Sequence, residues 1–212
     1  MGEDEPVTID DGRRVRALAM RQDRKESILD AAAKLFSERG YHTTSISHVI
    51  ERAGISRGTF YLYFDSKETL FLELMDSFIR QIVGAVQVVD PDGPEPEGRI
   101  ADNLRRVVDV VFDNRHLTLL VFRQSIGIND EVDAKLRRLY GFLQEMVQGA
   151  LVNGAESGLT RACNAPLVAT ALIGAMKEVF FRLLVEQSDV EHDREAVTAE
   201  LLDFGLGGLR KR

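Results

Sequence analysis

The stretch ISRGTFYLYFDSKETL, residues 55–70, decides the fold of this chain. Four aromatic side chains fall within five of its positions, at Phe60, Tyr61, Tyr63 and Phe64. A buried core accommodates the two phenylalanines, which stand at i and i+4, but it has no use for the arginine and the tyrosines around them. The mixture therefore predicts a short helix that packs on one side and presents polar groups on the other.

The residues around this stretch predict further helices, each with its own start and stop signals. Before it, residues 21–39 carry an apolar face at Ile28, Ala31, Ala32, Leu35 and Phe36, and Gly40 can end that helix in a left-handed conformation. Ser45 is a suitable N-cap for a second helix that stops at Gly54, and Ser56 is one for the third. Asp65 with Glu68 predicts a capping box that opens a long helix over residues 66–89.

The remaining chain reads as helices without a strand. Three of the five prolines lie in DPDGPEPEG, residues 90–98, which predicts a loop. Beyond it the pattern predicts helices near residues 99–114, 116–126, 130–153, 166–187 and 193–210. We therefore expect an all-α fold of about nine helices. Its parts are a flexible N-terminal extension (1–20), a helix-turn-helix domain (21–68) and a ligand-binding and dimerisation domain (69–212).

The charge is unevenly distributed along the chain. The net charge of −7 argues against a nucleic-acid binder. Residues 13–70, however, hold eleven lysines and arginines against seven acids, whereas the segments before and after are acidic. A local basic face can bind DNA while the rest of the molecule carries the opposite sign.

Composition excludes several classes of protein. A single cysteine, Cys163, allows no intrachain disulfide and no multi-cysteine metal site. No apolar run approaches the roughly 20 residues that cross a bilayer. The acidic start, MGEDEPVTIDDG, lacks an apolar signal core. We expect a cytoplasmic protein without cofactor, metal or membrane partner, and we find no spacing typical of an enzyme active site.

Two short helices joined by a glycine-containing turn have the dimensions of a helix-turn-helix. At the start of the second one, Arg57 can bond guanine and the methyl group of Thr59 can meet a thymine methyl. Gly58 lets the backbone approach the duplex. The hydroxyls of Tyr61 and Tyr63 suit phosphate oxygens, as does Lys67 at the start of the next helix.

The same residues carry a family resemblance. TTSISHVIERAGISRGTFYLYFDSKETLFLEL, residues 43–74, resembles the N-terminal signature of TetR/AcrR transcriptional regulators. The resemblance implies base contacts from Arg57, Gly58, Thr59 and Tyr61. It implies phosphate contacts from Thr44, Ser45, Ser47, Tyr63 and Lys67, and Ser56 completes the DNA-binding set.

The resemblance also implies a dimer formed through the last two long helices and a small-molecule cavity in the C-terminal domain. The segment before Arg24 is longer than in many members of the family. GRRVRALAMRQDRK, residues 12–25, is basic and can follow the phosphate backbone or a minor groove. The alternative is a disordered tail.

A ligand pocket needs an apolar lining with a few polar groups. Candidates in the C-terminal domain are Phe112, His116, Leu120, Arg123, Tyr140, Phe142, Met146, Met176 and Phe180. Arg123 can bind the carboxylate of an acidic or acyl ligand, or it can instead pair with Glu178 or Glu131. Most of the aromatic candidates can equally be core.

The helix over residues 166–187 has small residues, Ala169, Ala171, Gly174 and Ala175, which allow a second helix to approach closely. The last helix offers Val197, Leu201, Leu202, Phe204 and Leu209. Two such helices from each of two chains can form a four-helix interface. Packing within one chain is the alternative.

These patterns together predict a homodimeric regulator, most simply a repressor, that a small molecule of unknown identity releases from a palindromic double-stranded DNA operator. One alternative is an architectural DNA-binding protein without an effector. A more remote one is a helical enzyme.

Overall fold

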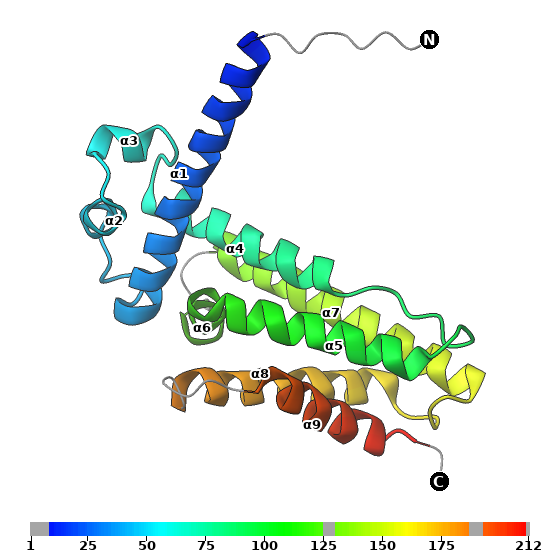
Figure 1. The fold of residues 1–212 in the computed structure, drawn as a ribbon. Helices are drawn as coiled ribbons and strands as arrows, with labels where there is room; N and C mark the ends of the chain where they lie inside the picture. The colour runs from blue at the N-terminus through cyan, green and yellow to red at the C-terminus, as the bar shows by residue number, and fades with distance from the viewer. Residues whose placement is uncertain (1–8, 125–129, 187–192, 211–212) are drawn as a thin grey trace, which may run out of the picture. The chain divides into compact units, whose positions relative to one another are not determined.

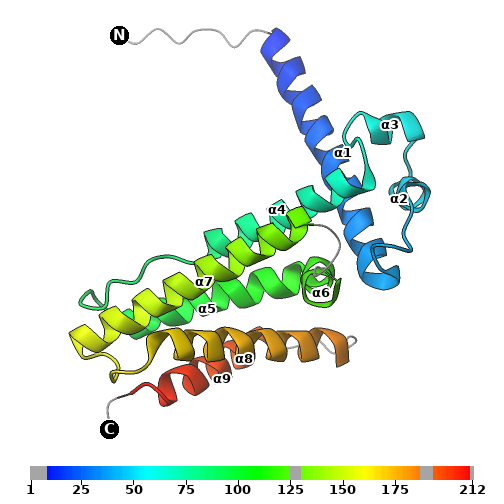
Figure 2. The ribbon, with the colours of Figure 1, turned by 180° about the vertical axis from the view of Figure 1, so that it is seen from behind.

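The computed structural model of the chain describes residues 9–124, 130–186 and 193–210 (Figure 1). Those ranges contain nine helices and no strand, which confirms the all-α prediction (Figures 1 and 2). The helices are α1 (Ile9–Arg39), α2 (Ile46–Ala53), α3 (Arg57–Tyr61), α4 (Lys67–Ala85), α5 (Pro96–Asp113), α6 (Arg115–Gln124), α7 (Asp130–Ser157), α8 (Ala165–Glu186) and α9 (Arg194–Gly207).

The chain divides into two compact units, residues 1–74 and 75–212. The first holds α1, α2, α3 and the first turns of α4, and the second holds the remaining helices. The domain borders expected at residues 20/21 and 68/69 stay predictions.

The N-terminal unit is built around one aromatic cluster. Three rings pack with centroids 4.9–5.8 Å apart: Phe36 of α1, Tyr41 of the loop that follows it, and Phe71 of α4. Ile28, Val49 and Phe60 bring α1, α2 and α3 to the same core, and each is fully buried. The predicted apolar face of the first long helix is thereby confirmed, because the side chains spaced for one face are the buried ones.

The C-terminal unit packs its helices in pairs. In Figures 1 and 2, α5 lies between α7 and α9, and the chain contacts join α7 to α8 and α5 to α9. Val108, Leu120 and Val132 are fully buried on α5, α6 and α7. A smaller cluster, Leu151, Ala165, Ala169 and Leu209, lies where the last turns of α7 and the first turns of α8 meet the residues that follow α9.

Several boundaries differ from the sequence prediction. Helix α1 begins at Ile9, so residues 9–20, expected as a flexible extension, continue the helix. Helix α4 ends at Ala85 rather than 89. Helix α5 begins inside the expected 90–98 loop, because Pro96 occupies a first-turn position that needs no amide donor.

The cap of α4 is also one residue away from the prediction. The amide of Thr69 donates to the Ser66 hydroxyl at 3.0 Å, and the amide of Ser66 donates to the Thr69 hydroxyl at 3.0 Å. This reciprocal pair does what Asp65 and Glu68 were expected to do. The Thr69 hydroxyl takes the place of a glutamate carboxylate in this capping box, so the prediction that Asp65 and Glu68 cap α4 is wrong.

Candidate functional site

Helix α2 begins with the predicted cap. The amide of His48 donates to the Ser45 hydroxyl at 3.3 Å, and the Ser45 amide donates to Nδ1 of His48 at 3.2 Å. His48 is half-buried, and its ring fixes the start of the helix. Gly54 ends α2 with φ of 62°, a left-handed conformation that glycine adopts without strain.

Helix α3 begins one turn later, again as predicted. Ser56 accepts the amide of Thr59 at 3.1 Å, and the two hydroxyls lie 2.8 Å apart. Phe60 is fully buried and Phe64 nearly so, whereas Tyr61 is 43% exposed. Helix α3 thus has one side that packs and one side that is exposed. Its five residues form little more than one turn, and only Phe60 among them is buried.

The exposed side of α3 gathers the residues predicted to read bases. Arg57 and Gly58 are exposed, and the Arg57 guanidinium carbon lies 5.8 Å from the centre of the Tyr61 ring. A Cβ added to Gly58 would meet only the Ser56 hydroxyl, at 3.8 Å, so the backbone there is open to a close partner. Arginine, threonine and tyrosine side chains over an accessible backbone can bond both base edges and phosphates.

Lys67 has a structural role that the sequence did not reveal. Its ammonium donates to the carbonyls of Tyr41, at 2.8 Å, and Thr44, at 2.9 Å, and lies 4.3 Å from the centre of the Tyr41 ring. Burial lowers the pKa of Lys67 from its ordinary value. Lys67 therefore holds the loop between α1 and α2 against the start of α4. Two of its three donors are committed to that task, which leaves one for a phosphate.

Thr44 does not fit the role that the resemblance implies. Its side chain is 1% exposed, and its hydroxyl donates to the carbonyls of Gly40, at 2.8 Å, and Leu35, at 3.3 Å. The prediction of a phosphate contact from this side chain is wrong, because the hydroxyl caps the end of α1 inside the unit. Ser45 and Ser47 are exposed at the start of α2, and Tyr63 is half-buried beside Arg21, whose guanidinium carbon lies 5.9 Å from the ring centre.

Eight of the nine predicted ligand residues have described side chains, and these occupy three kinds of position in the C-terminal unit. Leu120 and Phe180 are buried, and the rings of Phe112 and Phe180 meet edge to face at 6.5 Å. His116, Tyr140, Met146 and Met176 are half-buried. Phe142 on α7 is 42% exposed and lies outside the buried core, so its place in a pocket lining stays a prediction.

The side chain of Arg123 lies outside the described residues. Both acids proposed as its partner are paired with other cations: Glu178 with Arg182, at 2.8 Å, and Glu131 with Lys135, at 4.0 Å. Those two pairs are i,i+4 neighbours on one helix, a local arrangement that needs no distant partner.

Lys177 is the residue that sequence reasoning missed. Its ammonium lies 5.9 Å from the Phe122 ring centre and 5.7 Å from the Tyr140 ring centre, so one cation joins α6, α7 and α8. Burial raises the pKa of the Tyr140 hydroxyl. Among the described residues Lys177 makes no ion pair. The available signal was a single cation in the apolar run IGAMKEVFF, residues 173–181.

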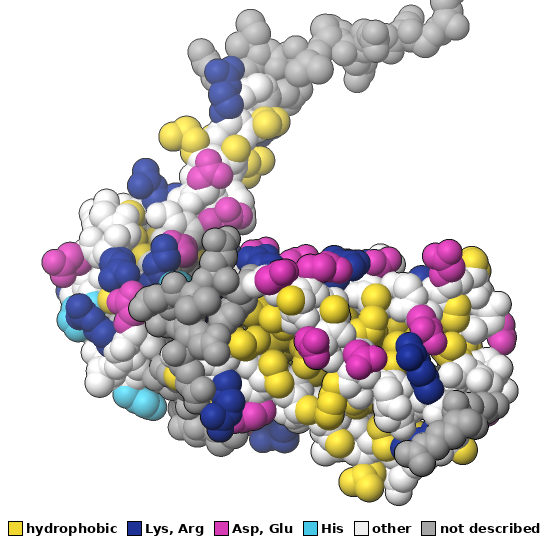
Figure 3. All heavy atoms as spheres, turned by 60° about the horizontal axis from the view of Figure 1, so that its bottom comes forward, with side chains coloured by type: hydrophobic (Ala, Val, Ile, Leu, Met, Phe, Trp, Pro, Cys, Tyr) yellow, Lys and Arg dark blue, Asp and Glu magenta, His cyan; other side chains and the backbone are white. Residues whose placement is uncertain are grey.

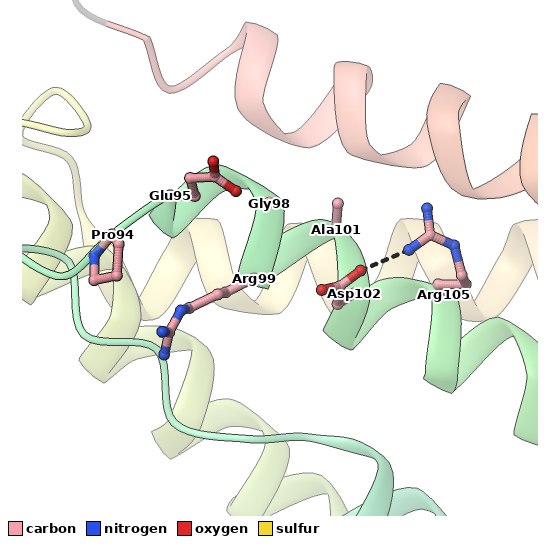
Figure 4. A pocket seen from close by; sticks show the side chains of 7 residues that line it. All are labelled: Pro94, Glu95, Gly98, Arg99, Ala101, Asp102 and Arg105. Carbon is pink, nitrogen blue, oxygen red and sulfur yellow. Dashed lines mark hydrogen bonds and ion pairs between the residues drawn. The ribbon is translucent and has the colours of Figure 1, made fainter.

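A polar groove lies at the start of α5 (Figure 4). Arg105 on its edge pairs with Asp102 at 2.6 Å and with Glu195 of α9 at 2.9 Å, which raises the pKa of the guanidinium above its ordinary value. None of the nine predicted ligand residues lines this groove, whose residues are Pro94, Glu95, Gly98, Arg99, Ala101, Asp102 and Arg105.

Helices α8 and α9 expose an apolar surface. Leu167 and Phe204 are each 66% exposed, and a Cβ on the exposed Gly174 would meet nothing within 4 Å. Figure 3 shows hydrophobic side chains gathered over this side of the C-terminal unit. Leu209 and Ala169, predicted for a dimer interface, are instead buried within the chain.

Two kinds of site are absent from the described part of the chain. It contains no group of three or more histidine, cysteine, aspartate or glutamate side chains placed to hold a metal ion. No helix within it is long and apolar enough to cross a membrane.

Comparison with known proteins gives a family match for the DNA-binding region. Residues 28–74 match the model for "Bacterial regulatory proteins, tetR family". An uncharacterised helix-turn-helix transcriptional regulator of Bacillus subtilis, YhgD, is 27% identical over 88% of this chain and 97% of its own length.

Two further similar proteins concern fatty acids. The fatty acid metabolism regulator protein of Bacillus subtilis is 24% identical over 87% of this chain and 95% of its own. The crystal structure of FadR from Bacillus subtilis in complex with stearoyl-CoA has a TM-score of 0.65 at 22% identity, over 86% of this chain and 98% of that one.

Proposed function

Because this chain belongs to the TetR family and is a DNA-binding transcriptional regulator, we propose that α3 is its recognition helix and enters the major groove. The observation that carries this proposal is the exposed pair Arg57 and Gly58, with the half-buried Thr59 beside them, over the buried Phe60. Arg57 bonds a guanine, and Thr59 contacts the neighbouring base. The exposed hydroxyls of Ser45 and Ser47, with Tyr63 and the third donor of Lys67, contact phosphates.

TetR-family regulators act as dimers on operator DNA, and the exposed apolar side of α8 and α9 suits that arrangement. Leu167, Gly174 and Phe204 supply a small and apolar surface for a second copy. A two-fold dimer places two recognition helices on a pseudo-palindromic site. In our proposal the bound dimer represses transcription by occupying a promoter, in the cytoplasm where the DNA is.

We assign the effector to the class of long-chain acyl thioesters. The similar Bacillus subtilis protein is in complex with stearoyl-CoA. In this chain Leu120, Phe112 and Phe180 are the apolar side chains that suit an acyl chain. Lys177, between the Phe122 and Tyr140 rings, supplies a cation for the anionic part of such a ligand.

Selection of bound fragments from the DNA of the source genome tests the DNA-binding proposal. We expect a few sites that share a palindrome, and Arg57→Ala should abolish their enrichment. Broad coverage without a palindrome would instead favour the architectural alternative.

Titration of that operator with stearoyl-CoA tests the effector. We expect the ligand to weaken operator binding about 100-fold, near 2.7 kcal/mol, and operator DNA to weaken ligand binding by the same factor. Free coenzyme A is the control for the nucleotide part. Lys177→Met should weaken the binding of stearoyl-CoA, whereas Arg182→Met, which removes an exposed cation of the same helix, should leave it unchanged. Stearoyl-CoA that binds without changing operator affinity would refute the switch.

A further inference from the structure

The N-terminal half of α1 stands outside the core of its unit. The first fully buried residue of the helix is Ile28, and every side chain from Arg14 to Arg24 is exposed. Residues 13–25 contain six lysines and arginines and one acid, Asp23. A strongly basic helix that its own unit does not cover calls for an acidic partner.

Three of these basic residues are arranged on one side of the helix. The buried side chains of α1 follow helical spacing at Ile28, Ala32 and Leu35. The same spacing continued toward the N-terminus, at four, seven, eleven and fourteen residues before Ile28, gives Arg24, Arg21, Ala17 and Arg14. The stripe that is apolar inside the unit therefore becomes an arginine stripe beyond it.

Two contacts fix which way this stripe points. Arg21 lies over the Tyr63 ring, and Lys25, one turn later, pairs with Glu73 at 3.1 Å and lies 6.0 Å from the Phe64 ring centre. Tyr63 and Phe64 belong to the segment that joins α3 to α4, and Glu73 lies on α4 itself. The stripe thus leaves the unit on the side of the DNA-reading residues, beginning beside Tyr63.

The arginines of the stripe are exposed to solvent. Within the part of the chain that the structure describes, Arg14, Arg21 and Arg24 form no ion pair. Arg14 and Arg21 are about 10.5 Å apart along the helix at 1.5 Å per residue, which matches about three base pairs of duplex at 3.4 Å each.

The exposed apolar residues of the same segment do not form a competing surface. Val15, Leu18 and Met20 are between 64% and 70% exposed. At 100° per residue, Met20 lies on the helix about 140° from Val15 and about 160° from Leu18. A helix-packing stripe requires these side chains on one face, so a partner helix is a poorer fit than a polyanion.

We propose that residues 12–24 of α1 form a second DNA-binding element, in which Arg14, Arg21 and Arg24 contact phosphates of the duplex next to the segment read by α3. The proposal rests on the proposed function, since it requires that α3 bind DNA. The element extends the footprint on each side of the operator and adds affinity without adding base preference, because phosphates carry no sequence information.

The test is a salt titration of the full-length triple variant Arg14→Ala, Arg21→Ala, Arg24→Ala on operator and scrambled DNA. We expect affinity to fall by the same factor on both DNAs. The slope of log affinity against log salt should become shallower by about 0.9 for each phosphate that the variant no longer neutralises. Arg16→Ala is the matched control, because Arg16 lies about 160° from Arg14 and about 140° from Arg21 around the helix, outside the stripe, and donates to the Gly12 carbonyl at 3.0 Å.

Shortening the operator gives a second measurement. Residues 9–21 of α1 extend about 18 Å beyond Arg21, or about five base pairs. Removing five base pairs from each flank should reduce the affinity of the unchanged protein to that of the triple variant and leave the triple variant unaffected.

The outcomes separate the two proposals. A variant with unchanged slope, a decrease in affinity confined to the operator, or an equal effect of Arg16→Ala would each overturn the arginine stripe while leaving α3 as the reader. If the unchanged protein binds no operator, the proposed function itself fails. Circular dichroism of the variants distinguishes the removal of phosphate-binding side chains from unfolding of the helix.

Discussion

The exposed face of the N-terminal unit is polar and basic, whereas the exposed face of the C-terminal unit along α8 and α9 is small and apolar. Arg57, Gly58 and Tyr61 stand over a filled aromatic core in the first unit. In the second unit the apolar side chains of Leu167 and Phe204 are each 66% exposed. The difference fits the two partners that we propose: a polyanion that stays hydrated, and a second copy of the chain that excludes water.

The two units also use cations over aromatic rings differently. Lys67 over Tyr41 donates to two backbone carbonyls and closes a loop of its unit. Lys177 lies between Phe122 and Tyr140 without an ion pair among the described residues. The first lysine stabilises a loop of its unit, whereas in our proposal the second binds the anionic part of a ligand.

The largest effect should come from the buried side of α3. Phe60→Ala removes a fully buried ring and should destabilise the N-terminal unit by about 3–5 kcal/mol, because the cavity cannot collapse around so short a helix. Tyr61→Ala removes the edge-to-face contact of a half-exposed ring with Phe60, so it should lower stability by about 0.5–1.5 kcal/mol and should also weaken DNA binding. Chemical denaturation beside operator titration measures both. Equal destabilisation by the two variants would contradict the division of α3 into a packing and a reading side.

The next effect tests the apolar face of the C-terminal unit. Phe204→Glu should break the dimer and lower operator affinity about 100-fold or more, because a desolvated charge opposes association and the second half-site is lost. Light scattering reports the dimer, and circular dichroism should be unchanged since Phe204 is exposed within the chain. Val88→Glu, at a 96% exposed residue between α4 and α5, is the control. A Phe204→Glu variant that remains dimeric would move the interface elsewhere.

A smaller effect compares two cations of the N-terminal unit. Arg57→Ala should reduce the free energy of binding to the operator by about 1–3 kcal/mol, since it removes a base contact. Its effect on binding to scrambled DNA should be small. Lys67→Ala should weaken binding to operator and scrambled DNA alike. It should also lower the melting temperature, because Lys67 donates to two backbone carbonyls. If Lys67→Ala left the melting temperature unchanged, the structural role of this lysine would be wrong.

The smallest effect concerns the exposed ion pairs that join α5 to α9. The hydrogen bond from Arg105, helped by its charge, lowers the pKa of the Glu195 carboxyl. A lowered carboxyl pKa stabilises the fold above the unfolded value, near pH 4, and that contribution disappears as the pH falls through the folded value. Glu195→Gln should therefore lower the melting temperature slightly at pH 7, and this deficit should shrink as the pH falls below the unfolded value. Glu156→Gln, at an exposed acid without an ion pair among the described residues, should change neither. A deficit that does not shrink as the pH falls would exclude the ion pair as its cause.

Local patterns determined most of the N-terminal unit from the sequence. Ser45, Ser56, Gly40 and Gly54 start and stop their helices as predicted, because caps and left-handed glycines act within three or four residues. The burial of Phe60 and Phe64 followed from their spacing. Where a local signal had two possible readings, as in DSKET at residues 65–69, the choice of capping residue was wrong.

The sequence by itself determined the all-α fold, the helix-turn-helix and its exposed reading side, since each depends on contacts between neighbours in the chain. Only the tertiary structure showed that the hydroxyl of Thr44 is bonded inside its unit, that Phe142 is exposed, and that Leu209 packs within the chain. Tertiary packing likewise brought Lys177 of α8 to rings on α6 and α7. These outcomes depend on which helices meet across long separations in the chain, and an amphipathic pattern specifies that a face is buried without specifying what covers it.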